Sequence, residues 1–115
     1  MVLQQLCQVD ELPVGEKRSF TLPDRSIVLY HLADGFYATQ RFCAHMFAPL
    51  DRGRIVEGDQ IQCFLHHSRF DIRTGAVRQW ANFPPGIQLL NILRSERPLN
   101  TYPTVVKEGV VYVDI

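Results

Sequence analysis

Two stretches of the chain, FCAHMFAPL at residues 42–50 and QCFLHHSRF at residues 62–70, each place one cysteine close to one histidine. Thiolates and imidazoles are the usual protein ligands of zinc and of iron–sulfur centres. In a reducing compartment, cysteines beside histidines are more often metal ligands or reactive thiols than disulfide partners. The two stretches therefore decide how the rest of the sequence is interpreted, because together they predict one metal centre.

The candidate ligands are spaced as Cys43-x-His45, then 17 intervening residues, then Cys63-x-x-His66. By ligand type alone, two thiolates and two imidazoles suit zinc and an iron–sulfur centre equally well. Structural zinc fingers usually take both cysteines from one knuckle and both histidines from a helix. Here each loop mixes the two ligand types, which suits a [2Fe–2S] cluster with two cysteines on one iron and two histidines on the other.

The remainder of the chain has an all-β pattern. Short alternating or β-branched runs are separated by turn residues every eight to twelve positions, and this predicts an antiparallel β-sandwich or small barrel. Predicted strands occupy residues 17–22, 26–32, 36–40, 54–56, 60–63, 69–72, 76–79, 103–106 and 110–114. Predicted turns are Pro23-Asp24-Arg25, Ala33-Asp34-Gly35, Glu57-Gly58-Asp59, Thr74-Gly75 and Lys107-Glu108-Gly109. At most one short helix is expected, at residues 86–96 between prolines.

The composition narrows the class of protein. The chain has 115 residues, 46% of them hydrophobic and 21% charged, which suits one folded domain over residues 1–115. Twelve basic and twelve acidic residues cancel, and this argues against a nucleic-acid or anionic-membrane surface. No signal peptide or membrane-spanning run is evident, so a cytoplasmic protein is the default expectation. Cys7 has no histidine near it and is interpreted as a buried structural thiol.

With the ligand pattern in view, the sequence resembles the Rieske-type [2Fe–2S] ferredoxins. The resemblance extends over DGFYATQRFCAHMFAPLDRGRIVEGDQIQCFLHHSRFDIRTGAV (residues 34–77) and includes the closing RPLNTYPTVVKEGVVYV (residues 97–113). It implies a cluster-binding subdomain at about residues 41–83. It also implies one [2Fe–2S] cluster per chain, with the inner iron held by Cys43 and Cys63.

The same resemblance assigns His45 and His66 to the outer iron, close to the surface from which an electron leaves. His67 has no counterpart among the family's ligands and is expected to be a neighbouring or surface side chain. His31 lies within a predicted strand and is interpreted as an ordinary strand histidine.

The chain departs from the family pattern around the cluster. Phe47 and His67 stand where the family usually has glycine, and Phe64 replaces a common proline. These changes affect loop geometry, and Phe47, Phe64 and Leu65 are expected to shield the cluster with apolar surface.

High-potential members of the family clamp the two loops with a disulfide, for which this chain has no cysteines. Ser68 matches a serine that donates a hydrogen bond to a cluster sulfide in those members, whereas Phe70 replaces their tyrosine donor. Such hydrogen bonds raise the potential by stabilising the reduced cluster. We therefore expect a reduction potential in the lower half of the range of about −150 to +300 mV for two-histidine clusters.

By resemblance, the protein is an electron carrier and not itself an enzyme. It would accept one electron from an NAD(P)H-dependent flavin reductase and pass it to a terminal oxygenase that hydroxylates aromatic rings, binding both transiently. Two alternatives stay open: a Rieske small subunit of a nitrite reductase or a monooxygenase carrier, and a zinc-stabilised interaction module.

Residues 79–97, QWANFPPGIQLLNILRSER, form a longer segment than expected for such a carrier. Pro84-Pro85-Gly86 suits a loop over the cluster, and Trp80 is expected in the core. The apolar remainder predicts either a short element packed on the core or an exposed patch for self-association through residues 86–94.

Overall fold

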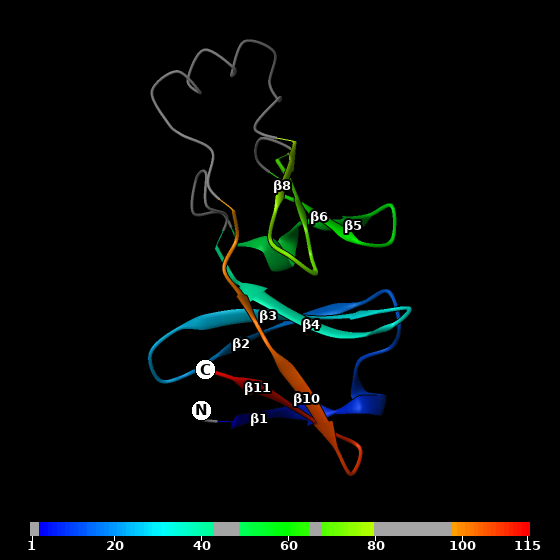
Figure 1. The fold of residues 1–115 in the computed structure, drawn as a ribbon, viewed down its shortest axis with the longest axis vertical. Coiled ribbons are helices and arrows are strands. Elements are labelled where there is room, and N and C mark those ends of the chain that lie inside the picture. The colour runs from blue at the N-terminus through cyan, green and yellow to red at the C-terminus, as the bar shows by residue number, and fades with distance from the viewer. Residues whose placement is uncertain (1–2, 43–48, 65–67, 80–97) are drawn as a thin grey trace.

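Strands make up most of the described structure. The computed structural model describes residues 3–42, 49–64, 68–79 and 98–115, which form three antiparallel sheets stacked along the long axis of the molecule (Figure 1). Within these ranges the helical elements are two short 3-10 turns, η1 (Val9–Glu11) and η2 (Leu50–Arg52). No helix in the described part is long and apolar enough to cross a membrane. The predicted all-β antiparallel class is confirmed.

The first sheet joins the two ends of the chain. It has the order β1-β11-β10, with β1 (Leu3–Gln8) and β10 (Thr104–Lys107) on either side of β11 (Val110–Asp114). Leu3 pairs with Asp114, so the first described strand begins beside the end of the last one. The sheet lies at the end of the molecule opposite β5–β8 (Figure 1).

The second sheet is the middle layer and has the order β2-β3-β4-β9. Its strands are β2 (Lys17–Thr21), β3 (Ser26–Leu32), β4 (Gly35–Gln40) and β9 (Thr101–Tyr102). Pro103 separates β9 from β10, and proline cannot donate a ladder hydrogen bond. The chain therefore passes from the second sheet to the first at this residue.

The third sheet is a four-stranded meander that follows the first predicted ligand loop and flanks the second on both sides. Its order is β5-β6-β7-β8, with strands β5 (Arg54–Val56), β6 (Gln60–Gln62), β7 (Arg69–Asp71) and β8 (Val77–Gln79). Each strand has only three residues, so this sheet depends on packing against the layer below it.

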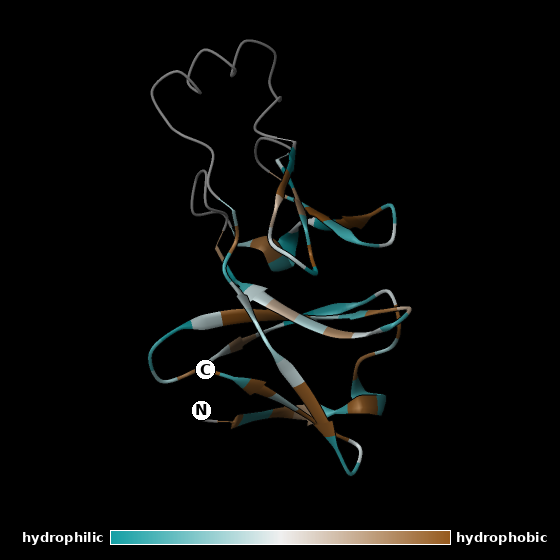
Figure 2. Ribbon diagram, viewed as in Figure 1, coloured by the Kyte–Doolittle hydropathy of each residue, from teal (hydrophilic) through white to brown (hydrophobic). Residues whose placement is uncertain are grey.

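Strand β3 contributes to both hydrophobic cores, because its side chains alternate between its two faces. Ile27 and Leu29 pack into a cluster with residues of the first sheet, and Val28, Tyr30 and Leu32 pack into a cluster with residues of the third. All five are at most 2% exposed. Hydrophobic stretches accordingly run through strands of all three sheets, with hydrophilic residues at the turns (Figure 2).

All nine predicted strands are present, with ends shifted by a residue in some cases. Two strands were not predicted: β1, which buries only Cys7, and β9, which has two residues. The helix expected at residues 86–96, and with it the whole 86–94 patch and the Trp80 interpretation, falls outside the described residues.

Asp71 organises the turn that connects β7 to β8. Its carboxylate accepts hydrogen bonds from the backbone N–H groups of Arg73 (2.8 Å) and Thr74 (3.1 Å) and from the Arg78 guanidinium (2.8 Å). Burial by itself would raise the pKa of Asp71, but the bonds from Arg78, Thr74 and Arg73 outweigh it and lower the pKa overall.

Gly75, in the same turn, ties it to the returning C-terminal segment. Its N–H donates to Asp71 O (2.7 Å), and its carbonyl accepts from the N–H of Leu99 (2.8 Å). Gly75 has φ +79°, and a Cβ there would collide with the carbonyl oxygen of Leu99. Glycine is thus required on both conformational and steric grounds.

Replacing Asp71 by asparagine is expected to lower the free energy of unfolding at pH 7 by about 2 kcal/mol, because a buried ionic acceptor of three hydrogen bonds is lost. A carboxyl group with a lowered folded pKa stabilises the fold above its unfolded pKa of about 3.9, and this contribution disappears as the pH falls through the folded pKa. The difference between the two proteins should therefore shrink below about pH 4. Denaturant unfolding followed by circular dichroism measures both effects. Asp24→Asn, at an exposed turn, is the control, and an equal loss in that variant would contradict the assignment.

Candidate metal centre

The first ligand loop is closed at its base by backbone pairing. The N–H of Leu50 donates to the carbonyl of Arg41 (2.6 Å), and Phe42 and Pro49 form an isolated antiparallel bridge. The Nε of Arg41 donates to Asp51 Oδ1 at 3.1 Å, while its guanidinium lies 5.4 Å from the centre of the Phe42 ring. The residues that flank positions 43–48 on both sides are therefore fixed against each other.

The second ligand loop is closed in the same way. The N–H of Cys63 donates to the carbonyl of Ser68 (2.8 Å), one step beyond the paired residues Gln62 and Arg69. The side chains of that pair also bond, because Arg69 Nε donates to Gln62 Oε1 at 2.9 Å. The chain thus enters and leaves positions 64–67 at adjacent points of β6 and β7.

Gly53 brings the two loop bases together. A Cβ at this position would collide with the carbonyl oxygen of Gln62 and would lie 3.3 Å from that of Leu50. Its φ of −77° is ordinary, so glycine is needed here for close approach and not for a special conformation. Because Gly53 has no side chain, the segment that leaves the first loop lies directly on the strand that enters the second.

Cys63 is the predicted ligand that the structure describes. It follows β6, is 2% exposed, and belongs to the core cluster that contains Leu50, Ile61 and Phe70. Thiolates are costly in apolar surroundings unless a cation is coordinated directly. The position suits the inner, shielded end of a metal centre.

Ser68 supplies an unusual polar group next to Cys63. Its residue is fully buried, and among the described residues its hydroxyl has no hydrogen-bond partner. A buried hydroxyl without a partner costs roughly 1–3 kcal/mol. A sulfur acceptor held by Cys63 would satisfy this donor, so the residues present fit an iron–sulfur group at this place.

Comparison with known proteins gives a consistent result. Residues 2–103 match the family model described as Rieske [2Fe-2S] domain. The chain is 31% identical over 114 residues to the biphenyl dioxygenase ferredoxin subunit of Pseudomonas sp. (strain KKS102), covering 99% of this chain and 93% of the relative. It is 32% identical over 111 residues to the 3-phenylpropionate/cinnamic acid dioxygenase ferredoxin subunit of Photorhabdus laumondii, covering 96% and 91%.

The chain belongs to the Rieske [2Fe–2S] ferredoxins. Its fold agrees with the solved ferredoxin of carbazole 1,9a-dioxygenase from Nocardioides aromaticivorans IC177, at a TM-score of 0.80 and 26% identity over 98% of this chain and 97% of that one. A second solved structure, a complex of reduced oxygenase and oxidised ferredoxin in carbazole 1,9a-dioxygenase, matches at a TM-score of 0.81 and 27% identity, over 97% and 92%. The expected cofactor, a Rieske [2Fe–2S] cluster, is confirmed at the level of the family.

Of the four predicted Rieske ligands, Cys63 is described and buried, and Cys43, His45 and His66 fall outside the described residues. The same holds for Phe47, Leu65 and His67. Within the described ranges no three or more histidine, cysteine, aspartate or glutamate side chains come together to hold a metal ion. The four-residue ligand set therefore stays a prediction.

Two further sequence interpretations are confirmed. His31 lies on β3, stacks on the Phe36 ring at 4.0 Å, and has Nδ1 2.6 Å from the carbonyl oxygen of Leu12. Cys7 is 6% exposed, and burial, with the nearby charge of Glu11, raises the pKa of its thiol. Cys7 packs in a different core cluster from Cys63.

Sequence reasoning missed Gly53 and the Arg41–Asp51 pair, which position the two ligand loops. A glycine between two arginines directly after a loop is a visible signal for close backbone approach. The residue that makes the close approach, Gln62, becomes evident only once β5 and β6 are paired.

Replacing Ser68 by alanine in the Rieske protein is expected to lower the reduction potential by roughly 40–90 mV. The lost bond to the reduced cluster is worth about 1–2 kcal/mol, which is converted to a potential as a one-electron couple. Redox titration followed by visible circular dichroism measures the shift. Ser19→Ala on β2 is the matched control, and an unchanged potential in Ser68→Ala would show that the hydroxyl bonds elsewhere.

Proposed function

We propose that this protein is the electron carrier of a multicomponent aromatic-ring dioxygenase. It accepts one electron from an NAD(P)H-dependent flavin reductase and delivers it to the terminal oxygenase, so it is not itself an enzyme. Support comes from full-length similarity to ferredoxin subunits of dioxygenase systems and from a matching fold seen in complex with an oxygenase.

The observation that carries this proposal is the buried Cys63, whose N–H bonds to the carbonyl of Ser68, together with the Ser68 hydroxyl, which is buried and has no partner among the described residues. Cys43 and Cys63 would hold the inner iron, and His45 and His66 the outer one. The bound cluster supplies reversible one-electron chemistry. The chain contributes an apolar wall of Leu50 and Phe70, which excludes water from the inner side.

The hydrogen bonds available to the cluster set the expected potential. Ser68 is one donor, and Phe70, fully buried on β7, has no hydroxyl with which to be the second. The carrier therefore has a potential in the lower half of the two-histidine range of about −150 to +300 mV. A cluster with such a potential can accept an electron from a reduced flavin.

Resemblance to the family supports the following organisation of the carrier as part of the proposal. Residues 1–115 form one Rieske domain with the cluster-binding subdomain at about residues 41–83, and the protein works in the cytoplasm. Its contacts with reductase and oxygenase are transient. Self-association through residues 86–94 stays a prediction.

Reconstitution tests the proposed function. Anaerobically purified protein should be coloured, contain iron and labile sulfide, and show the low average g value of histidine ligation by electron paramagnetic resonance after reduction. Added to a flavin reductase and a ring-hydroxylating oxygenase, it should support NAD(P)H-dependent dihydroxylation of an aromatic substrate.

The Cys63→Ser variant, which removes an inner-iron ligand, should lose both colour and turnover. A colourless, zinc-containing protein would support the interaction-module alternative. A coloured protein that couples to nitrite reductase or monooxygenase components, but not to any dioxygenase, would support the carrier alternatives.

A further inference from the structure

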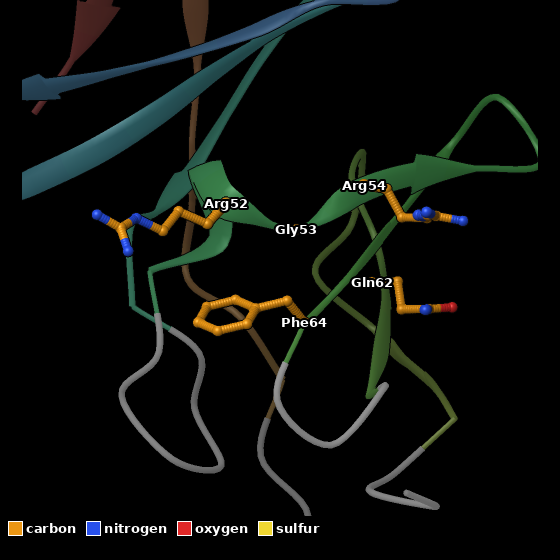
Figure 3. Close-up of a pocket in the computed structure, with 5 residues that line it drawn as sticks. All are labelled: Arg52, Gly53, Arg54, Gln62 and Phe64. Atoms are coloured by element: carbon orange, nitrogen blue, oxygen red, sulfur yellow. The ribbon is translucent and has the colours of Figure 1, made fainter.

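An open hollow lies beside the second ligand loop, and its rim is basic. It has a volume of about 540 Å³ and is lined by Arg52, Gly53, Arg54, Gln62 and Phe64. Figure 3 shows Arg52 and Arg54 extending to opposite sides of Gly53, with Phe64 and Gln62 from the facing segment. We call these five residues the arginine surface.

The positive charges of this surface are not neutralised by any residue that the structure describes. Arg52 and Arg54 are exposed, and neither forms an ion pair with any described residue. The nearby Arg69 bonds to the neutral amide of Gln62. Residues 43–48 and 65–67 of the two ligand loops contain no aspartate or glutamate, so these loops cannot supply a carboxylate to either arginine.

Three other arginines of the same region form ion pairs with aspartates. Arg41 bonds to Asp51, Arg78 to Asp71, and Arg73 to both Asp34 (3.0 Å) and Asp59 (3.6 Å). Three arginines therefore satisfy carboxylates within the fold, whereas the two on the arginine surface are left for a partner outside it.

Basic and acidic residues are also distributed unevenly along the whole chain. Residues 41–79 contain six arginines and four acidic residues, whereas residues 1–40 and 98–115 together contain four basic and seven acidic residues. A chain of zero net charge thus has a positive excess on the side of the ligand loops. Such asymmetry steers a charged partner toward one end of a molecule.

Phe64 supplies the apolar part of the surface. It follows Cys63 directly in the chain, and 43% of it is exposed. Aromatic side chains flanked by arginines are typical anchors at the centre of protein interfaces.

We propose that the arginine surface docks a carboxylate-bearing face of the terminal oxygenase, with Phe64 as the apolar contact beside Cys63. This inference rests on the proposed function and adds to it the chemistry of the partner. In the transfer, one electron leaves the reduced protein and reduces the partner's acceptor by one equivalent, with no bond made or broken and no proton required.

Small charged oxidants test the local field directly. The reduced protein is mixed in stopped flow with hexacyanoferrate(III), an anion, or with hexaammineruthenium(III), a cation, each of which takes one electron. At low ionic strength, Arg52→Glu/Arg54→Glu should slow oxidation by the anion about tenfold and speed oxidation by the cation, and added salt should reduce both effects.

The control is Arg18→Glu/Lys107→Glu, which changes the net charge equally at exposed positions of β2 and β10. It should leave both rates close to those of the wild type. Equal effects in the two double variants would overturn the proposal, because they would reflect net charge only. Unchanged absorption spectra and reduction potentials show that both variants retain the cluster.

The protein partner is then tested with the oxygenase that supports turnover by the wild type. Binding measured by calorimetry at low salt should weaken about tenfold in Arg52→Glu/Arg54→Glu and in Phe64→Ala, and should weaken with added salt in the wild type. Tight, salt-independent binding by the charge-reversed variant would overturn the inference. Failure of the wild type to support any oxygenase would instead contradict the proposed function, so the two outcomes are distinguishable.

Discussion

Burial of both faces of β3 is the constraint on which the rest of the structure depends. Both faces of the strand SIVLYHL carry buried apolar side chains, so a layer must cover each side. The first sheet covers Ile27 and Leu29, and the third covers Val28, Tyr30 and Leu32. The small third sheet, whose strands have three residues each, exists because this apolar surface lies beneath it.

Burial of β3 also anchors the bases of the two ligand loops, which carry the candidate metal centre. Tyr30 is fully buried, its hydroxyl bonds to Thr39 Oγ1 at 2.8 Å, and burial raises the pKa of the phenol. It lies in one cluster with Leu50 and Cys63, which belong to the bases of the two ligand loops. The inner end of the centre is therefore continuous with the core, and the loops extend from a rigid base. Rigid support is what a site needs to keep its ligands in fixed geometry.

The features that could be predicted from the sequence are those encoded by residues close together in the chain. β3 and the turns at Gly58 and Gly75 are encoded by residues adjacent in sequence, and so is the ligand spacing around Cys63. By contrast, β1 (LQQLCQ) forms through backbone pairing with β11 and buries only Cys7, so it has no alternating hydrophobic pattern. β9 is too short for any pattern. The role of Gly53 depends on a carbonyl nine positions away, which only the paired sheet brings near.

Arginine has two roles in and around the third sheet, and the chemistry of its guanidinium group suits both. Between positions 41 and 79 arginine occurs six times and lysine not at all, and lysine occurs only at positions 17 and 107. Arg41 and Arg73 combine an ion pair with an aromatic contact, to Phe42 and Tyr37 respectively, which a planar guanidinium permits. The same group loses less hydration than an ammonium when it enters an interface and binds carboxylates through two parallel hydrogen bonds. Arg52 and Arg54 thus retain, toward a partner, the binding capacity that their neighbours use within the fold.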